Sequence, residues 1–347
     1  MAEQRTERGS EGSRVGVALV GCGNRGVNSH GVLAKASETV SLVAVCDVDE
    51  QRVEAAEAKL GVPGEQDHRR LLERDDVQAL IIATSAKWHV PIALDAVRAG
   101  KHVLIEKPLA DTSAAGRELA AAAQKAGVVA LVGYQARFTP FAVALKEAVG
   151  GIEPVHGLIT RQRAPFRTQF FFPDHSGGIM DALTHEIHLT LWAMGGPPTA
   201  VYASIARGSI LKDETIEFAN ILIEFDGGQR SATVMGSMFG PQTPNVVQFI
   251  GRRGTVTSQD RKTLKIVRHQ GVTEPAPAQP VGLVATTVET SGEGDATGVM
   301  LTHFANLISG RETSLRGATL REGADAVAVT EAAVESARTG RRVEMHA

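Results

Sequence analysis

The stretch "GCGNRG", residues 21–26, decides how the first part of this chain is interpreted. It follows the short apolar run "VGVALVG" (15–21) and precedes a segment with helical spacing. Between a strand and a helix, the first glycine permits a tight turn and the second lets the backbone approach a pyrophosphate, while the third allows close helix packing. Three glycines can also form a simple turn. The surrounding sequence therefore has to decide between the two interpretations.

Apolar runs alternate with helical segments throughout the first 134 residues. The runs are short and rich in Val, Leu and Ile, which is typical of strands buried on both faces, and the helical segments end at glycine. This alternation predicts an α/β fold with a doubly wound parallel sheet and right-handed crossovers. The predicted strands are residues 15–21, 41–47, 79–85, 102–106 and 128–134, and the predicted helices are residues 49–61, 90–100 and 113–127.

Asp47 supplies the second feature of a dinucleotide site. It ends a predicted strand about 20 positions after the glycine stretch, where an acidic residue reaches the ribose hydroxyls of adenosine. A carboxylate at this place would repel the additional phosphate of NADP, so the sequence favours NAD over NADP. The alternative is that the glycines only form a turn and that Asp47 only caps the following segment.

The motif "EKPLA" (106–110) follows the fourth predicted strand, at the edge where doubly wound sheets bind ligands. This position places Lys107 beside the nicotinamide. A lysine before a proline is more often a surface residue at the start of a loop, but here the strand directs it into the crevice. The Lys107-Pro108 bond can also be cis, because X-Pro bonds tolerate that isomer.

The segment "SGGIMDALTHEIHLTLWAMGG" (176–196) has helical periodicity between two glycine pairs. At about 100° per residue, Asp181, His185, His188 and Trp192 share one stripe, and an apolar set shares another. We therefore expect a helix with a core face and a polar face. A single helical histidine is usually structural, and Asp181 can simply stabilise the helix dipole. Two histidines and a carboxylate on one stripe favour a functional role.

The same residues permit a metal interpretation, which the sequence does not favour. "HEIH" spaces its histidines by three, whereas the zinc-protease motif spaces them by four. Asp181, His185 and His188 could form a three-ligand site, but no further Cys or His cluster supports it. We therefore expect no metal.

Composition limits the partners of the chain. Its 347 residues, 43% of them hydrophobic, predict a two-domain protein. The formal net charge of -3 predicts no attraction for nucleic acid or an anionic membrane. Cys22 and Cys46 are too few for a disulfide framework and fall in apolar stretches, as expected in a reducing, cytoplasmic compartment. The polar residues 1–13 predict a disordered tail without a signal peptide, and no apolar run is long enough to span a membrane.

The second part of the chain is rich in predicted strands. After a helix at 138–150, alternating patterns such as that of residues 217–225 predict a mainly antiparallel sheet, and a glycine-rich loop is expected at 285–298. Helices can cover one face of this sheet, and a partner subunit is expected on the other. The segment 161–178 carries arginines among aromatic residues, so Arg163 is a candidate substrate ligand. An oligomer contact is an equally good interpretation of this segment.

Several of these motifs together resemble the glucose-fructose oxidoreductase / inositol dehydrogenase (Gfo/Idh/MocA) family. The resemblance rests on "VALVGCGNRG", "VAVCDVDEQR", "AGKHVLIEKPLA", "LVGYQARFTP", "GGIMDALTHEIHLTLWAMGG" and "VTEAAVESARTGRRVEM". It implies an NAD-binding Rossmann domain, assigned here to residues 14–134, and a larger α/β domain over 135–347. The open sheet of the second domain is expected to form a homodimer or homotetramer.

The resemblance also implies roles for individual residues. Lys107, Asp181 and His185 would be catalytic: His185 would accept the hydroxyl proton, Lys107 would bind the same oxygen, and Asp181 would hold a neighbouring hydroxyl or orient the base. His188 stands where the family often has an acidic residue, which leaves the charge preference of the substrate open. The expected cofactor-binding residues are Gly21, Gly23, Asn24, Arg25, Gly26, Asp47, Thr84, His89, Glu106 and Lys107, and the expected substrate-binding residues are Tyr134, Arg163, Asp181, His185 and His188.

Three functions fit these motifs. The first is an NAD-dependent dehydrogenase that acts on a secondary alcohol of a sugar, an inositol or a related polyol. The second is a redox-neutral lyase, epimerase or glycoside-cleaving enzyme that oxidises its substrate transiently with tightly bound NAD. The third is a noncatalytic NAD-dependent sensor, which would not need Lys107 or His185.

Overall fold

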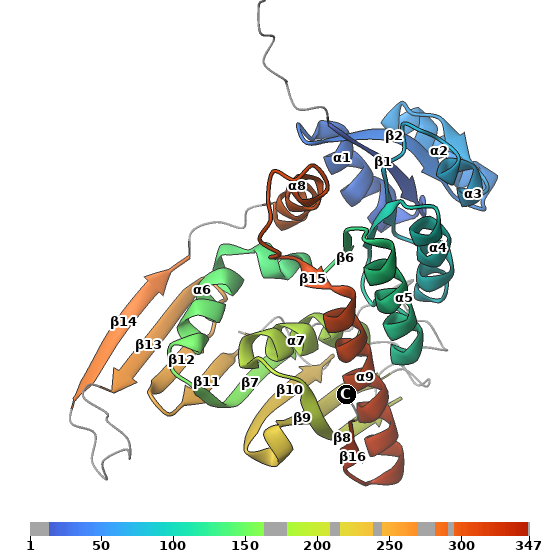
Figure 1. The fold of residues 1–347 in the computed structure, drawn as a ribbon. Coiled ribbons are helices and arrows are strands. Elements are labelled where there is room, and N and C mark those ends of the chain that lie inside the picture. The colour runs from blue at the N-terminus through green and yellow to red at the C-terminus, as the bar shows by residue number, and fades with distance from the viewer. Residues whose placement is uncertain are drawn as a thin grey trace, which may run out of the picture.

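The computed structural model describes residues 14–162, 179–208, 216–238, 245–269, 282–290 and 295–345. The predicted tail at 1–13 and the candidate ligand Arg163 lie outside these ranges. Two β-sheets organise the described chain. In Figure 1, helices surround a smaller first sheet, and a broad second sheet lies beside it.

The first sheet has seven strands in the order β15-β6-β5-β4-β1-β2-β3. All of its pairs are parallel except β15 with β6, and its longer strands fall on the predicted apolar runs. Strands β1 and β4 are neighbours, so the winding reverses there, which is where such sheets bind ligands. The predicted doubly wound sheet is confirmed. The strands are β1 (Val15–Val20), β2 (Val40–Cys46), β3 (Gly64–Glu65), β4 (Ala79–Ile82), β5 (His102–Ile105), β6 (Ala130–Val132) and β15 (Ala318–Thr319).

Local signals set the ends of the helices that connect these strands. At the start of α2, Asp49 accepts hydrogen bonds from the backbone N–H groups of Gln51 and Arg52, and Gly61 ends the helix with a φ of 69°. Gly127 ends α5 in the same left-handed conformation. The helices are α1 (Val32–Ala36), which continues the short η1 (Gly26–Gly31), α2 (Glu50–Leu60), α3 (His68–Leu72), α4 (Ala86–Arg98) and α5 (Ser113–Ala126).

Two elements from the far end of the chain complete the first sheet. Strand β15 adds an antiparallel edge next to β6, and α8 (Ala296–Ile308) packs against α1, β2 and η2 (Gln135–Phe138). Phe304 of α8 is fully buried in the same core cluster as Val17 and Leu19 of β1. The folded first domain therefore includes two elements that follow residue 135 in the chain. The predicted domain boundary between residues 134 and 135 stays a prediction.

The second sheet has nine strands in the order β14-β13-β12-β11-β7-β10-β9-β8-β16. Within the described ranges, only β10 and β7 of this sheet pair in parallel, so the predicted mainly antiparallel sheet is confirmed. In β9, Ile221 and Ile223 are fully buried while Asn220 is exposed, as the alternation predicts. The strands are β7 (Pro154–Gln162), β8 (Pro198–Arg207), β9 (Ile216–Phe225), β10 (Arg230–Ser237), β11 (Val247–Gly251), β12 (Gly254–Ser258), β13 (Thr263–His269), β14 (Leu283–Glu289) and β16 (Val343–Glu344).

The prediction of a loop at 285–298 is wrong at both ends, because residues 296–298 begin helix α8 and the first part is a strand. Residues 285–289 belong to β14, which pairs along its length with β13. Nearly all of β14 is exposed, because it lies at the edge of the sheet. An edge strand that buries neither face has no apolar alternation, so sequence periodicity does not reveal it.

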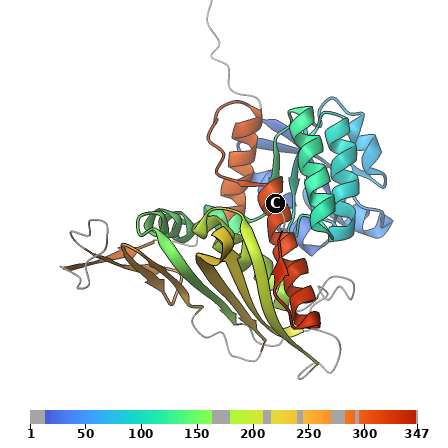
Figure 2. The same ribbon diagram turned by 60° about the horizontal axis from the view of Figure 1, so that its bottom comes forward.

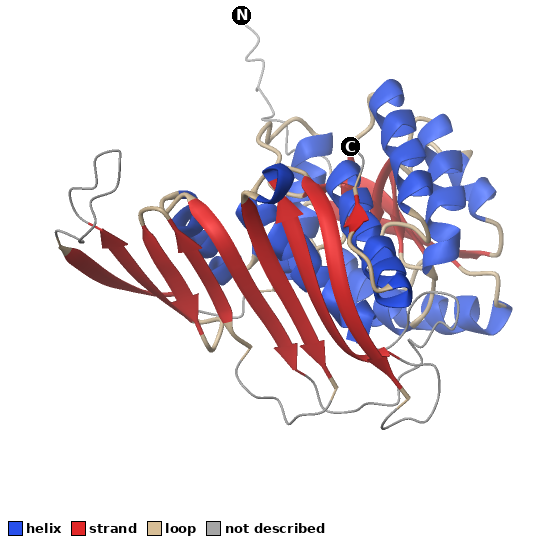
Figure 3. Cartoon of the chain, turned by 90° about the horizontal axis from the view of Figure 1, so that it is seen from below, coloured by secondary structure: helices blue, strands red, loops and turns tan. Residues whose placement is uncertain are grey.

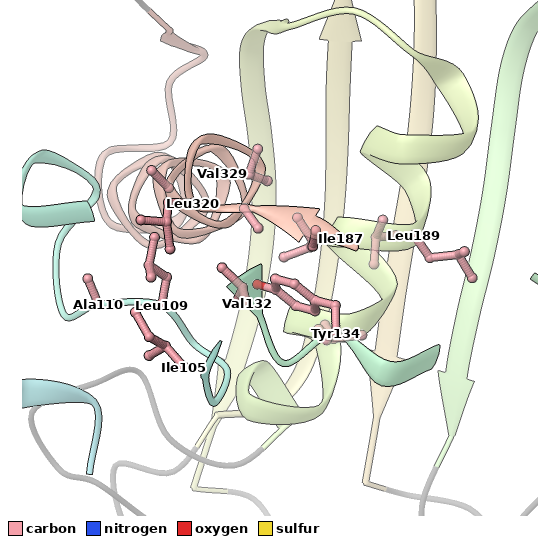
Figure 4. Close-up of a cluster of buried hydrophobic side chains, with 14 of the residues drawn as sticks. Ile105, Leu109, Ala110, Val132, Tyr134, Ile187, Leu189, Leu320 and Val329 are labelled. Carbon is pink, nitrogen blue, oxygen red and sulfur yellow. The ribbon is translucent and has the colours of Figure 1, made fainter. Parts of the chain in front are cut away.

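Three helices cover one face of the second sheet: α6 (Pro140–Gly150), α7 (Ile179–Met194) and α9 (Leu320–Thr339). Figure 3 shows the sheet facing the viewer with most of the helices behind it. Helix α9 also packs against α5 of the first domain, and Figure 2 shows it standing between the two sheets. Side chains from β5, β6, α7 and α9 form one buried cluster, drawn in Figure 4.

Helix α7 corrects the expectation of a polar face. His188 is as well buried as the apolar Leu183 and Ile187, and Glu186 is also fully buried. The helix packs against the second sheet on one side and against α6, α9 and η2 on others, so little of it contacts solvent. The polar side chains of Glu186 and His188 on this helix are therefore buried and do not form a solvent-exposed face.

Within the described ranges, no helix is both long and apolar enough to cross a membrane. Cys22 and Cys46 are buried free thiols, which agrees with the interpretation of their apolar surroundings. Burial, together with the nearby negative charges, raises the pKa of each thiol to about 12.

Candidate active site

The three glycines of the first loop are required for different reasons. Gly21 has a φ of 104°, and a side chain there would meet the Ala83 carbonyl oxygen at 2.5 Å. A Cβ on Gly26 would lie 1.9 Å from the carbonyl oxygen of Gly21, which shows that the helix packs on the turn. A Cβ on Gly23 would meet nothing within 4 Å. The protein itself does not require glycine at position 23, so this position fits the close approach of a ligand.

A cavity of about 480 Å³ borders this loop and separates it from α2. Its size is within the usual range for ligand sites. Asn24 is exposed at its rim and accepts a hydrogen bond from the Asn28 side chain at 2.5 Å. The cavity is lined by Cys22, Gly23, Asn24, Val27, Asn28, Asp49, Gln51, Arg52, Ala55, Ala56 and Lys59.

The carboxylate of Asp47 is held beside the glycine loop. It accepts one hydrogen bond from the backbone N–H of Cys22 at 2.8 Å and another from the N–H of Asp49 at 3.1 Å. Asp49, and not Asp47, is the residue that caps α2. The alternative in which Asp47 only caps the following segment is therefore wrong, and its position next to the loop fits the predicted ribose contact.

Glu106 is a buried carboxylate at the end of β5, next to Lys107. Its Oε1 lies 2.7 Å from His30 Nε2 and 2.8 Å from Arg25 Nε, and its Oε2 accepts a hydrogen bond from the backbone N–H of Lys107 at 3.1 Å. Burial alone would raise the pKa of Glu106, but the hydrogen bonds and charges of His30 and Arg25 lower it well below the ordinary value. The carboxylate of Glu106 therefore links the glycine loop to Lys107.

His89 connects the ends of β4 and β5. Its Nδ1 lies 2.8 Å from the Pro108 carbonyl oxygen and its Nε2 lies 3.1 Å from the Thr84 carbonyl oxygen. Burial lowers the pKa of His89, so the ring is neutral at neutral pH and donates to one carbonyl at a time. The Lys107-Pro108 peptide bond is cis, as the sequence allowed.

Helix α7 carries His185. The ring keeps part of its surface exposed, while Nδ1 is buried and has no hydrogen-bond partner among the described residues. Tyr134 lies against it edge to face, with ring centroids 5.9 Å apart and planes at 83°. Figure 4 shows Tyr134 reaching toward α7 in the cluster that contains Ile187.

The surroundings of His185 keep it neutral. Burial lowers its pKa to about 3, and the positive charge of Lys107 is the next cause. The charges of Arg161 and Arg25 act in the same direction, whereas Glu106 opposes them. The effect of Lys107 indicates that this lysine and His185, which come from different domains, lie close enough to interact electrostatically.

We expect the protein to lose stability through His185 as the pH falls from about 6.5 toward 3. In this window the unfolded chain binds a proton at the ring and the folded protein does not, so acid favours unfolding. Between pH 7 and pH 5, this ring should account for about 2 kcal/mol of the lost free energy of unfolding. Urea unfolding of wild type and His185→Asn at both pH values measures the difference. Equal losses in the two proteins would contradict the assignment.

Some predicted site residues cannot be placed in full. Asp181 lies on α7 about one turn before His185, but its side chain and Arg163 are outside the described part of the structure. The described residues contain no group of three metal-ligating side chains, and the alternative of a metal site with Asp181 is left untested. The cofactor and substrate roles of the predicted residues stay predictions.

Sequence analysis missed two groups of buried polar residues near the site. His30 was not predicted, because a single histidine in the first helix carries no distinctive spacing. Glu186, next to His185, is fully buried and pairs with Arg161 at 3.2 Å and with Arg261 at 2.6 Å. These arginines lie on β7 and after β12, so only the folded chain brings them to Glu186.

Comparisons with known proteins agree with this geometry. Residues 15–134 match the model of the GFO_IDH_MocA "Oxidoreductase family, NAD-binding Rossmann fold", and residues 146–345 match that family's "C-terminal alpha/beta domain". The first domain is thus an NAD-binding Rossmann domain.

Two relatives are named as inositol dehydrogenases. The chain is 34% identical over 255 residues to inositol 2-dehydrogenase of Rubrobacter xylanophilus, which covers 71% of this chain and 72% of the relative. It is 31% identical over 222 residues to myo-inositol 2-dehydrogenase of Thermotoga maritima, covering 61% of this chain. That match spans 65% of the relative, just under two thirds of its length.

A solved structure has the same architecture over almost the whole chain. It is GenD2 from gentamicin A biosynthesis, determined in complex with NAD, with a TM-score of 0.77 and 26% identity over 99% of each chain.

Proposed function

Because the chain belongs to the Gfo/Idh/MocA oxidoreductase family, we propose that it is an NAD-dependent dehydrogenase acting on a secondary alcohol of a sugar, inositol or related polyol. The observation that supports this proposal is that Glu106 joins the glycine loop to Lys107 through hydrogen bonds, and that the charge of Lys107 acts on His185 of the second domain. The names of two relatives, both inositol dehydrogenases, support the substrate class.

The residues of this chain suit the removal of a proton from an alcohol. His185 is neutral at neutral pH and can accept the hydroxyl proton at Nε2, since Nδ1 is buried. Lys107 would donate a hydrogen bond to the same oxygen and stabilise the negative charge that develops there. Asp181, about one turn earlier on α7, would hold a neighbouring hydroxyl. Bound NAD would supply the hydride acceptor.

The proposed positions for the cofactor follow from the glycine loop and the residues around it. Gly23 leaves room for the pyrophosphate, and Asp47 would bind the ribose hydroxyls. Glu106 and Arg25 join this loop to Lys107. The nicotinamide would then lie between the end of β5 and His185.

A panel of sugars and inositols, each tested with NAD and with NADP, tests this function. Formation of reduced cofactor in proportion to product would support a dehydrogenase. Product formation without added NAD and without accumulation of NADH would instead identify the redox-neutral enzyme. If no substrate reacts, but NAD alters the binding of another protein and Lys107→Ala does not change that effect, the sensor is the right interpretation.

Asp47→Ala should weaken the preference for NAD over NADP. The carboxylate is held beside the loop by the N–H groups of Cys22 and Asp49, where it would repel a 2′-phosphate. We expect the ratio of kcat/KM with NAD to that with NADP to fall by about tenfold or more, the effect of one lost hydrogen bond to a charged group together with relief of repulsion. Glu54→Ala, an exposed change on α2, is the control. An unaltered ratio would remove Asp47 from cofactor selection.

We also propose that the second sheet forms a homodimer or homotetramer. Tyr202 on β8 and Ile250 on β11 are large apolar side chains that are 47% and 43% exposed. A partner subunit would cover them. Light scattering coupled to size-exclusion chromatography measures the mass, and a monomer at micromolar concentration would contradict the proposal.

A further inference from the structure

The orientation of His185 has no hydrogen-bonded support among the described residues. A base of this kind usually has its second ring nitrogen held by another group. Accepting a proton at Nε2 requires the hydrogen to be on Nδ1, yet Nδ1 is buried without a partner in the described part of the chain. Among the described residues, ring packing is the interaction seen to fix the plane of His185.

Tyr134 supplies that packing from the first domain. Its ring meets His185 edge to face, at a centroid distance of 5.9 Å, and is only 1% exposed. Its hydroxyl is 3.0 Å from the hydroxyl of Thr184, the residue before His185 on α7. Tyr134 is thus bonded to the same turn of helix that carries the base. Figure 4 shows it at the boundary between the first domain and α7.

His188 supports the other side of Tyr134. The two rings are stacked with centroids 3.9 Å apart and planes within 3° of each other. His188 is 3% exposed, and its Nε2 has no hydrogen-bond partner in the described residues. Burial, and then the charge of Arg137, lowers its pKa well below the ordinary value, so it is a neutral ring. A neutral, buried imidazole with an unused nitrogen acts as a flat packing surface.

We propose that Tyr134, supported by His188, is a positioning residue that sets the ring plane of His185 and excludes water from its buried side. The proposal rests on the proposed dehydrogenase function for its kinetic consequence. It gives His188 a packing role, in place of the substrate contact expected from the sequence. Neither ring needs to exchange a proton.

The charged groups around His185 come from several elements. Lys107 and Glu106 face it from the end of β5, Arg25 from the glycine loop, and Arg161 from β7. All of them remain when Tyr134 is changed. Removing the Tyr134 ring would admit water to the buried side of His185, so the contribution of burial would decrease and its pKa would rise from about 3 toward the ordinary value.

Tyr134→Leu should therefore lower kcat by about 10- to 100-fold, the range expected when a reacting group is displaced by about 1 Å. The Kd for NAD should change by less than about twofold, and the acid limb of the kcat/KM profile should move to higher pH. Tyr134→Phe keeps the ring and loses the bond to Thr184, so kcat should stay within about threefold of wild type. Val143→Ala, at an exposed position on α6, is the control. Unchanged kcat and pH profile in folded Tyr134→Leu would overturn the proposal.

His188 provides a second pair of variants in case Tyr134→Leu does not fold. His188→Phe keeps a flat ring and removes the unused nitrogen, so kcat should stay within about threefold of wild type. His188→Ala removes the support and should shift the acid limb upward, as Tyr134→Leu does. If His188→Phe loses as much activity as His188→Ala, the imidazole itself takes part in the reaction and the packing role is wrong.

A direct titration separates this proposal from the dehydrogenase function. The pKa of His185 can be followed by NMR in the full chain with labelled histidine, using His185→Asn to assign the signal. A higher pKa in Tyr134→Leu supports the positioning role even if no polyol is oxidised. Suppose instead that wild type oxidises a polyol and that the pKa of His185 is the same in Tyr134→Leu as in wild type. This result would refute the positioning role and leave the dehydrogenase function intact.

Discussion

Replacing His185 with alanine should lower turnover by about two to four orders of magnitude. The ring is neutral at neutral pH and is the proposed acceptor for the hydroxyl proton, so its loss would remove that acceptor. NAD should still bind with a nearly unchanged Kd, because the glycine loop and Asp47 lie in the other domain. Steady-state kinetics, together with NAD binding measured by calorimetry, tests both statements.

Lys107→Ala should have an effect of similar size for a different reason. It removes the positive charge that would stabilise the oxygen as the proton leaves. The backbone N–H of Lys107, which donates to Glu106, would be retained, so the loop should keep its position. Lys87→Ala, an exposed change on α4, is the control for the loss of a surface charge. Near-normal turnover in either His185→Ala or Lys107→Ala would remove that residue from the mechanism.

Gly23→Val should weaken NAD binding by about 100-fold or more, which corresponds to about 2.7 kcal/mol, without lowering the stability of the fold. A Cβ at this position meets no protein atom within 4 Å, so we expect the free energy of unfolding to change little. The new side chain would occupy the space that the pyrophosphate needs. Calorimetric titration with NAD and urea unfolding of the same preparation measure the two quantities.

Gly21→Val is the matched comparison for Gly23→Val. A Cβ there lies 2.5 Å from the Ala83 carbonyl oxygen, and the φ of 104° strains any residue with a side chain. This variant should lose stability as well as NAD binding. If Gly23→Val bound NAD normally, the pyrophosphate would not approach the loop at this residue.

The sequence predicted the first domain well because its strands are buried on both faces. Apolar runs such as 79–85 and glycine-ended helices such as 113–127 are local signals, whereas the strand order comes from the structure. The second sheet was predicted in outline, since β9 alternates clearly. Strand β14 was missed because it is exposed at an edge, and β15 because two residues carry no period.

The candidate site was predicted only as a set of residues. Asp47 and Lys107 were found because each follows a strand at a recognisable position, and His185 because it shares a helical stripe with other polar groups. Their states were not predictable. The pKa of His185 depends on burial and on Lys107, Glu106, Arg161 and Arg25, which are separated along the chain by up to 160 residues or so and meet only after folding.

The residues themselves determined the chemistry available to this protein: a glycine loop with a following carboxylate, a lysine at a strand end and a histidine pair on one helix. Tertiary structure alone decided how these groups act. It turned His188 inward onto Tyr134, left one nitrogen of His185 without a partner in the described chain, and paired Glu106 with His30 and Arg25. The physical reason is that periodicity reports which face of a helix is polar, whereas burial, ring packing and charge depend on which distant elements cover that face.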